Sequence, residues 1–406
     1  MIKQAAIALA IGLLTMAPGW AAPGRDGGTT PEEGGSSPAQ VSFATPDGLF
    51  VMPPQGGVRQ PLDESAEGFL NPVVWSADGQ HLALVENYTD VYRLHWDATR
   101  KTKVFSSPCQ QSPTLDLTWQ GDNATLLIKQ QCPGATLDAP AQLDLFLVDA
   151  NGNLTALPPL PPQLESDVYI SPDGTRLAYV ASQHIYVAGL DGAAPQQITQ
   201  EPGLYGAAGS PLVWSPDGQQ IAFYEGSYPF QRINVVGVDG TNRRLLTPDP
   251  DFQIYRSRLS WSPDGRYMAT YVPFSPPFSN QEVVMLITVA TGEIQTITRP
   301  GFYSALNWSP DSQHLILAAG EQLERQALFL LDLATTTFTT LTPEPFQQVV
   351  DSGWSTQGDW IAFTAIAIGD DVGNQVLHVV RPDGTQLAAL TAPNEYAYPF
   401  AWVPAP

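Results

Sequence analysis

The sequence is poor in lysine, cysteine and histidine, and it carries far fewer basic than acidic residues. It has 18 basic against 40 acidic residues, a formal net charge of −22, and its lysines are Lys3, Lys101, Lys103 and Lys129. So acidic a chain is repelled by phosphate backbones and by anionic lipid headgroups. We therefore expect neither nucleic acid nor a membrane surface among its partners, and solubility is the plain consequence of the charge.

The patterns that mark common catalytic and metal sites are missing as well. No histidine pair has H-E-x-x-H or other ligand spacing, no glycine-rich phosphate loop is found, and there is no G-x-S-x-G nucleophile elbow. The acidic loops at residues 247–252 and 368–374 lack EF-hand spacing and are interpreted as solvated turns. Calcium in these loops and a zinc site assembled across the chain are the alternatives; we expect no metal, no cofactor and no catalytic residue.

The N-terminus, MIKQAAIALAIGLLTMAPGWAA, has the parts of a secretory signal peptide. Lys3 is the positive region, residues 5–17 are an apolar run too short to span a bilayer, and Gly19 and Ala21 are small residues at signal-peptidase spacing. We expect a signal peptide over residues 1–21, with an uncleaved anchor as the alternative. Residues 22–40 indicate a flexible linker. The mature chain is thus expected to be periplasmic or extracellular, without membrane insertion.

The dominant feature of the sequence is an internal repeat. Segments such as VVWSADGQHLALV, LVWSPDGQQIAFY and LSWSPDGRYMATY recur, and their marker positions are Trp75, Trp119, Ile170, Trp214, Trp261, Trp308, Trp354 and Trp402. The spacings are 44, 51, 44, 47, 47, 46 and 48 residues. A period in the forties with strand-like units is typical of β-propeller blades and not of helical solenoids.

Each unit has four β-rich stretches separated by turn signals, and no helical periodicity follows the signal peptide. Residues 41–62 supply the later strands of a unit, and YPFAW at residues 398–402 supplies its first strand. We expect these ends to share one blade, which removes an open sheet edge. The sequence therefore predicts a single all-β propeller domain over residues 41–406 with about eight four-stranded blades. Seven is the alternative, because the second unit is degenerate.

The two cysteines, Cys109 and Cys132, flank the degenerate unit. An antiparallel hairpin that turns at residues 120–123 would bring them together at its open end, and export permits a disulfide. We predict a Cys109–Cys132 disulfide, with two unpaired buried cysteines as the alternative.

These motifs resemble the WD-like repeat of TolB and of the propeller domain in the dipeptidyl-peptidase IV group. The likeness rests on Trp-Ser-Pro-Asp-Gly, a following Ile-Ala-Phe stretch, a strand that ends in a glycine turn, and a stretch that ends in Leu-Thr, over roughly residues 41–402. The resemblance implies a β-propeller, in a family that hosts binding proteins, peptidase accessory domains and lyases. TolB has six blades and a preceding α/β domain, and the peptidases carry a hydrolase domain; we expect neither of these additional domains here.

Ser-Pro-Asp-Gly itself holds a hydroxyl and a carboxylate, yet it fits a type I turn. Its aspartate recurs as Asp78, Asp173, Asp217, Asp264 and Asp311, whereas a catalytic acid is needed once. We interpret it as a turn that ends the innermost strand, with the marker Trp packed between blades.

The candidate site lies at the opposite face, where the innermost strands begin. The loops that enter these strands carry aromatic residues and two arginines, and the binding candidates are Tyr205, Tyr255, Arg256, Arg258, Tyr303, Tyr396 and Tyr398. Exposed aromatics with arginine are typical of interaction surfaces. The alternative is that these rings fill gaps between blades.

From these patterns we expect an exported, monomeric, non-catalytic scaffold that binds a protein, peptide or glycan of the cell envelope. The alternative is a lyase or hydrolase with a site at the channel mouth. For that alternative the residues to test are Arg256, Arg258, Asp351 and Asp167.

Overall fold

The computed structural model describes residues 39–404 with internal gaps. The gaps are residues 65–71, 98–99, 110, 135–140, 162–163, 165, 204, 206–211, 227–230, 248–258, 274–281, 323, 344, 370–373, 394, 396 and 399. The predicted signal peptide and nearly all of the predicted linker lie outside the described residues. The described part of the chain forms strands and no helix, so it holds no helix able to cross a membrane.

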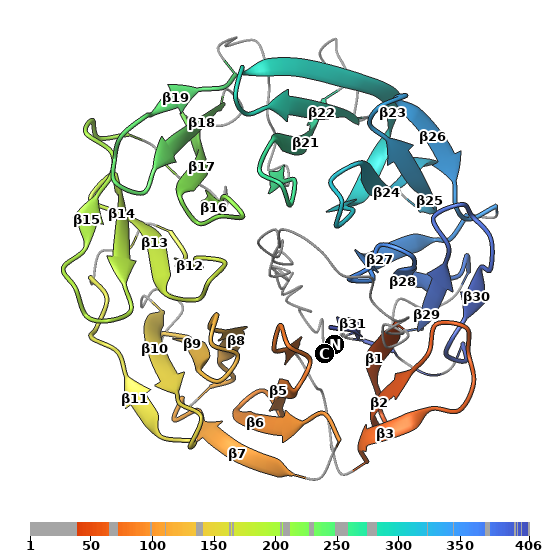
Figure 1. Ribbon diagram of the computed structural model, residues 1–406, viewed down its shortest axis with the longest axis horizontal. Helices are drawn as coiled ribbons and strands as arrows, with labels where there is room; N and C mark the ends of the chain where they lie inside the picture. Colours follow the sequence, from red (N-terminus) through yellow and green to blue (C-terminus); the bar gives the residue numbers. More distant parts are fainter. Residues whose placement is uncertain are drawn as a thin grey trace, which may run out of the picture.

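Antiparallel sheets stand around a common centre, with the first strand of each sheet innermost and the fourth at the rim (Figure 1). Five four-stranded sheets follow chain order throughout, as the alternation of turn signals and apolar stretches predicted. They are β4 (Val73–Trp75), β5 (His81–Glu86), β6 (Asp90–His95) and β7 (Lys101–Ser106); β8 (Thr114–Trp119), β9 (Leu126–Cys132), β10 (Gln142–Val148) and β11 (Leu154–Ala156); β12 (Tyr169–Ile170), β13 (Arg176–Ala181), β14 (His184–Gly189) and β15 (Gln196–Gln197); β16 (Val213–Trp214), β17 (Gln220–Glu225), β18 (Arg232–Gly237) and β19 (Arg244–Leu245); and β27 (Gln348–Trp354), β28 (Ile361–Ile366), β29 (Gln375–Val380) and β30 (Ala388–Ala389).

A seven-stranded sheet spans two of the sequence repeats. Its strands are β20 (Ser260–Trp261), β21 (Tyr267–Pro273), β22 (Glu282–Thr288), β23 (Glu293–Trp308), β24 (His314–Gln322), β25 (Arg325–Asp332) and β26 (Thr337–Thr340). The long strand β23 pairs with β22 through its first half and with β24 through its second half. It is therefore the outermost strand of one repeat and the innermost strand of the next.

The remaining sheet joins the two ends of the chain. It consists of β1 (Gln40–Thr45), β2 (Gly48–Met52), β3 (Gln60–Asp63) and β31 (Phe400–Val403), in the order β3-β2-β1-β31. β31 lies antiparallel to β1, with Phe43 opposite Phe400 and Gln40 opposite Val403. The predicted all-β propeller, closed by its terminal strands, is confirmed.

The marker tryptophans link neighbouring sheets by hydrogen bonds. Trp214 Nε1 donates to the carbonyl oxygen of Tyr169, the residue before marker Ile170, at 2.9 Å. The same bond runs from Trp119 to Val74, from Trp261 to Val213, from Trp308 to Ser260, from Trp354 to Asn307 and from Trp402 to Gly353. Because a buried indole N–H needs an acceptor, the bond fixes each ring between two innermost strands. The prediction that these rings pack between blades is confirmed.

Closure uses a hydroxyl relay in place of this direct bond. Trp75 Nε1 donates to Ser42 Oγ at 2.8 Å, and Ser42 Oγ donates to the Ala401 carbonyl oxygen at 3.1 Å. Ala401 precedes marker Trp402, so its carbonyl occupies the usual acceptor position. Ser42 is fully buried, and it connects three strands from both ends of the chain.

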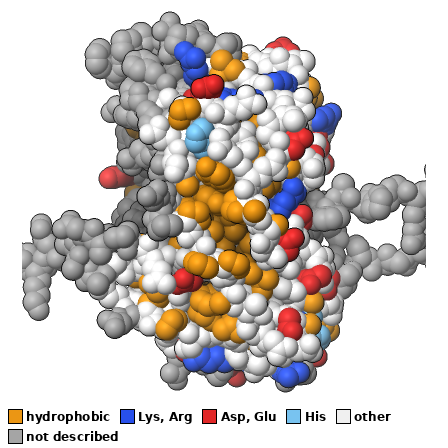
Figure 2. All heavy atoms as spheres, turned by 90° about the vertical axis from the view of Figure 1, so that its left-hand side faces the viewer, with side chains coloured by type: hydrophobic (Ala, Val, Ile, Leu, Met, Phe, Trp, Pro, Cys, Tyr) orange, Lys and Arg blue, Asp and Glu red, His pale blue; other side chains and the backbone are white. Residues whose placement is uncertain are grey.

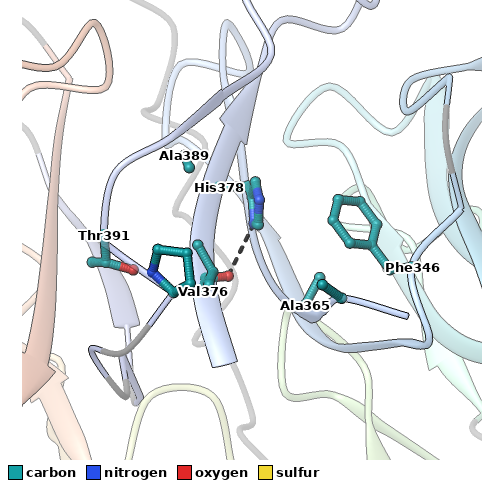
Figure 3. A pocket seen from close by; sticks show the side chains of 8 residues that line it. Phe346, Ala365, Val376, His378, Ala389 and Thr391 are labelled. Carbon is teal, nitrogen blue, oxygen red and sulfur yellow. Dashed lines mark hydrogen bonds between the residues drawn. The ribbon is translucent and has the colours of Figure 1, made fainter. Parts of the chain in front are cut away.

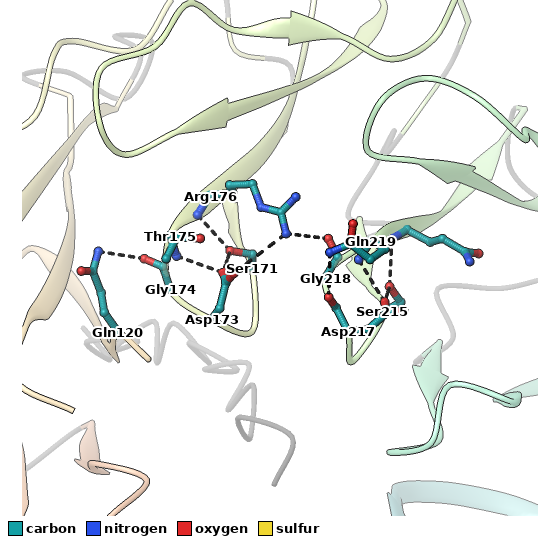
Figure 4. A network of polar contacts seen from close by, with 11 residues as sticks. Gln120, Ser171, Asp173, Gly174, Thr175, Arg176, Ser215, Asp217, Gly218 and Gln219 are labelled. Carbon is teal, nitrogen blue, oxygen red and sulfur yellow. Dashed lines mark hydrogen bonds and ion pairs between the residues drawn. The ribbon is translucent and has the colours of Figure 1, made fainter. Parts of the chain in front are cut away.

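Ser-Pro-Asp-Gly forms a turn whose polar atoms bind one another. Ser215 Oγ donates to Asp217 Oδ1 at 2.6 Å and accepts the backbone N–H of Gln220 at 2.9 Å. Gly218 adopts a left-handed φ of 65°, and its N–H donates to the Ser215 carbonyl. Neighbouring turns are also connected, since Arg176 donates to the Gly218 carbonyl at 2.8 Å (Figure 4). The serine hydroxyl, the aspartate carboxylate and the glycine thus stabilise the turn, in agreement with the sequence-based interpretation.

The sheet of β8–β11 is the irregular one. Cys109 and Cys132 form a disulfide with their Cα atoms 5.6 Å apart, as predicted from the hairpin. Figure 2 shows hydrophobic side chains gathered on the side of the ring where β10, β11, β14 and β15 lie. Half-buried leucines pack there against the core, namely Leu143, Leu147, Leu157, Leu160 and Leu164. Leu154 on the outermost strand is exposed.

Candidate functional site

The two faces of the ring differ in the lengths of the segments that connect the strands. We call the face with the Ser-Pro-Asp-Gly turns the turn face and the opposite one the loop face. On the turn face the first and second strands are joined by segments of nearly one length, such as residues 215–219 and 262–266. On the loop face the connections range from residues 182–183 to residues 198–212. Variation in length is therefore largest on the loop face, since the turn-face connections between third and fourth strands range only from residues 289–292 to residues 381–387.

Tyr205 lies on the loop face but is buried. Its side chain is 2 % exposed, its hydroxyl donates to the Glu201 carbonyl oxygen at 2.7 Å, and its ring meets Phe223 edge-on at 5.4 Å. Arg243 lies over both rings and pairs with Glu225 at 2.6 Å. The ring thus fills the gap between the β12–β15 and β16–β19 sheets, as the alternative interpretation expected of such aromatics.

Tyr303 and Tyr398 are half-buried. Tyr303 stacks on Tyr271 with ring centroids 4.9 Å apart. Its backbone N–H donates to the carboxylate of Glu282, while burial raises the pKa of that carboxyl above its ordinary value. Tyr398 donates its backbone N–H to the Ala44 carbonyl oxygen at 3.2 Å, beside the closing sheet.

The other four binding candidates, Tyr255, Arg256, Arg258 and Tyr396, lie outside the described residues. The structure therefore places three of the seven candidates on three different parts of the ring. It does not bring these three rings into one cluster.

The two acids considered for an enzyme are far apart. Asp167 precedes β12 and Asp351 lies on β27, and these strands are on opposite sides of the ring (Figure 1). Asp167 binds Lys129, whose Nζ lies 2.7 Å from Asp116 Oδ2 and 3.1 Å from Asp167 Oδ2. Burial alone would lower the pKa of Lys129, but the two carboxylates raise it. Lys129 is thus a protonated, fixed cation and not a free amine.

Metal-ligating side chains do not gather in the described part of the chain. No group of three His, Cys, Asp or Glu residues there could hold a metal ion. His81 and His95 approach each other with rings 5.6 Å apart. They belong to the turn-face ends of β5 and β6.

A pocket that the sequence did not indicate lies on the loop face of the β27–β30 sheet (Figure 3). Its volume is ≈ 170 Å³, and its lining residues are Phe346, Ala365, Ala367, Val376, His378, Ala389, Thr391 and Pro393. His378 is the one ionisable group in this lining. In the sequence His378 is only a polar residue inside an apolar stretch, because the pocket depends on residues from three strands and on Phe346 from the preceding connection.

Comparison with known proteins agrees with the fold. Residues 138–227 match the family model of the dipeptidyl peptidase IV N-terminal region. The dihydro-heme d1 dehydrogenase NirN superposes with a TM-score of 0.59 at 14% identity, over 93% of this chain and 78% of that one. An oligogalacturonate lyase solved with manganese superposes at 0.55 and 14% identity, over 86% of this chain and 97% of that one.

TolB from Acinetobacter baumannii is also recovered, with a TM-score of 0.41 at 15% identity, over 82% of this chain and 81% of that one. That superposition is too loose to add to the argument. The two better superpositions show the fold, and the family match shows the repeat. The chain is therefore a β-propeller, and its residues 138–227 are similar to the N-terminal region of dipeptidyl peptidase IV.

Proposed function

We propose that this chain is an exported, non-catalytic β-propeller that binds a protein, peptide or glycan of the cell envelope through its loop face. The observation that carries the proposal is the contrast between the two faces. The turn face repeats one short, internally hydrogen-bonded turn, whereas the loop face carries connections of variable length. Rigid sheets that present variable loops limit the entropy cost of recognition.

Export is supported by two independent features. The N-terminal sequence has the pattern of a signal peptide, which we propose is removed after Ala21. The Cys109–Cys132 disulfide fits an oxidising compartment. We propose that residues 22–40 then act as a linker to a single, monomeric domain over residues 41–406.

The binding contacts are proposed to come from aromatic and arginine side chains of the loop face. Tyr255, Arg256 and Arg258 belong to the connection between β19 and β20, after its Pro- and Asp-containing stretch at residues 247–252. Tyr303 lies on β23, and Tyr396 and Tyr398 precede β31. Tyr205 is proposed to act indirectly, because its buried ring supports the base of its loop. Such residues supply most of the binding energy in protein interfaces.

An enzyme is the second candidate, since two superposed propellers are a lyase and a dehydrogenase. These likenesses extend to the fold alone. Of the two acids considered for catalysis, Asp167 is paired with Lys129 and Asp351 lies on the opposite side of the ring, so they do not form a joint site, which favours binding.

The test is a quantitative pull-down from envelope extracts with three purified proteins. The loop-face variant is Tyr255→Ala with Arg256→Ala. The matched turn-face variant is Gln219→Ala with Gln313→Ala, both exposed residues of Ser-Pro-Asp-Gly-type turns. We expect one set of partners to be recovered by the wild type and the turn-face variant and lost by the loop-face variant.

Recovery of the same partners at the same yield by the loop-face variant would overturn the assignment to this face. Export is tested separately by fractionation and N-terminal sequencing. A mature chain that starts at Ala22 agrees with the proposal, and a chain that retains Met1 contradicts it.

A further inference from the structure

The pocket at His378 lies where two other repeats have a polar pair. In the β16–β19 sheet, Glu225 ends the second strand and pairs with Arg243 at 2.6 Å, and Asn234 donates to the same carboxylate at 3.1 Å. In the β4–β7 sheet, Glu86 and Lys101 hold the same two positions and form an ion pair. These polar side chains close the space between neighbouring sheets.

The β27–β30 sheet has small and apolar residues at the same positions. Phe363 pairs with His378 as Phe223 pairs with Asn234, so the registers correspond. Ala365 then stands in the place of Glu225, and Leu387 stands in the place of Arg243. Ala365 lines the pocket of ≈ 170 Å³, at a position where Glu225 and Glu86 carry longer side chains. Cavities of about 150 Å³ with apolar walls are large enough to bind benzene.

The orientation of the His378 ring is fixed by its surroundings. The ring stacks on Phe363 at 5.1 Å with an interplanar angle of 13°, and Phe346 meets its edge at 5.0 Å (Figure 3). Nδ1 lies 3.0 Å from the Val376 carbonyl oxygen. A carbonyl oxygen only accepts, so Nδ1 carries the proton of a neutral ring. Burial lowers the pKa of His378, which keeps the ring neutral at physiological pH.

The other ring nitrogen, Nε2, is therefore an acceptor, and no hydrogen bond to it occurs within the described residues. Thr391 Oγ1 already accepts the Leu377 N–H at 3.0 Å. Equivalent threonines make the same bond in other sheets, as Thr247 does with Ile233. The pocket thus combines apolar walls with a ring acceptor, Nε2, to which no described residue donates.

We propose that this pocket binds an uncharged aromatic ring that carries a hydrogen-bond donor, such as a phenol or an indole. No lining residue carries a charge opposite to that of an ionised ligand, and burying an unpaired charge is costly. The exposed rim residues Ala367, Ala389 and Pro393 open the pocket to the loop face. This proposal rests on the proposed binding function and assigns a ligand class to one pocket of the loop face. Its evidence is the pocket itself and does not depend on the identity of an envelope partner.

The test is titration of the full folded chain with phenol, toluene and benzoate, followed by NMR of protein labelled with ¹⁵N in the histidine rings. We expect phenol to shift the His378 Nε2 signal and to bind three- to tenfold more tightly than toluene, which has the same shape but no donor. Benzoate is expected not to bind. Equal affinity for phenol and toluene, or an unchanged Nε2 signal, would overturn the proposal.

Two variants separate the acceptor from the cavity. His378→Phe is expected to bind toluene and phenol equally, because the cavity remains and the acceptor is gone. Ala389→Leu, at the exposed rim, is expected to block both ligands without crowding the core. Thermal unfolding of each variant reports whether it is folded. Phenol binding that survives in both folded variants would contradict the assignment to this pocket.

A final comparison identifies the source of the ring. Tighter binding of N-acetyl-tyrosinamide and of short tyrosine peptides than of phenol supports a side chain of a partner protein. Binding of phenol but not of the peptides supports a free small molecule. If phenol binds at His378 while the loop-face variant recovers the same envelope partners, the pocket stands and the proposed partner face fails.

Discussion

Replacement of Ser42 by alanine tests how the ring is closed. Ser42 is fully buried, and its hydroxyl accepts the indole N–H of Trp75 at 2.8 Å and donates to the Ala401 carbonyl at 3.1 Å. The change removes both bonds and leaves two polar groups without their partner. Each bond contributes about 1 kcal/mol net, so we expect the free energy of unfolding to fall by about 2 kcal/mol.

Urea unfolding followed by tryptophan fluorescence and circular dichroism measures this loss, and the melting temperature should fall by roughly 4 °C. The matched control is Ser112→Ala at an exposed serine for which we expect a change below about 0.5 kcal/mol. A double-mutant cycle of Ser42→Ala with Trp75→Phe should give a coupling energy near 1 kcal/mol. If Ser42→Ala costs no more than Ser112→Ala, the relay does not hold the ends together.

Three further perturbations are expected to act through named contacts. Cys109→Ser with Cys132→Ser should lower stability by about 3 kcal/mol, and dithiothreitol should lower the melting temperature of the wild type but not of this variant. Gly320→Ala should lower the free energy of unfolding by about 3 kcal/mol or more, because the added Cβ would lie 1.9 Å from the Arg325 carbonyl oxygen. In the control Gly121→Ala the added Cβ has its nearest contact at 3.7 Å. Equal melting temperatures of the two variants would contradict this steric argument. The hydrogen bond from Arg59 holds the pKa of Glu395 below its ordinary value in the folded protein. The ion pair therefore stabilises the fold fully at a pH above the pKa that Glu395 has in the unfolded chain. This stabilisation is lost as the pH falls through the lower pKa of the folded state. Stability profiles of wild type and Glu395→Gln should therefore converge by at most about 1 kcal/mol as the pH falls below the unfolded-state pKa of the carboxyl, and parallel profiles would refute the linkage.

The architecture could be predicted from sequence because its determinants are local and repeated. Ser215, Asp217 and Gly218 satisfy their own turn, so each copy signals the end of an innermost strand without reference to the rest of the chain. The shared closing sheet and the disulfide followed from counting strands and turn positions. The seven-stranded sheet did not, because nothing local distinguishes the continuous strand β23 from two strands with a bend between them.

The candidate site was harder to predict because exposure is decided by distant partners. A tyrosine in a loop, such as Tyr205, resembles an exposed contact residue in sequence. Its burial depends on Phe223 and Arg243, which reach it from other strands. The sequence therefore locates the variable face of the ring, and tertiary packing decides which of its aromatic rings remain available for a partner.

His378 shows that comparing equivalent positions of the repeats is an additional source of information in the sequence. A lone histidine in an apolar strand carries little information, but the repeat supplies internal references for each position. Glu225 with Arg243, and Glu86 with Lys101, fill the place that Ala365 and Leu387 leave open. Repeats share one backbone, so residues at equivalent positions can be compared directly, and their side chains can differ in size without a change of fold. At His378 this comparison draws attention to a ring acceptor beside an apolar pocket, which the histidine alone does not indicate.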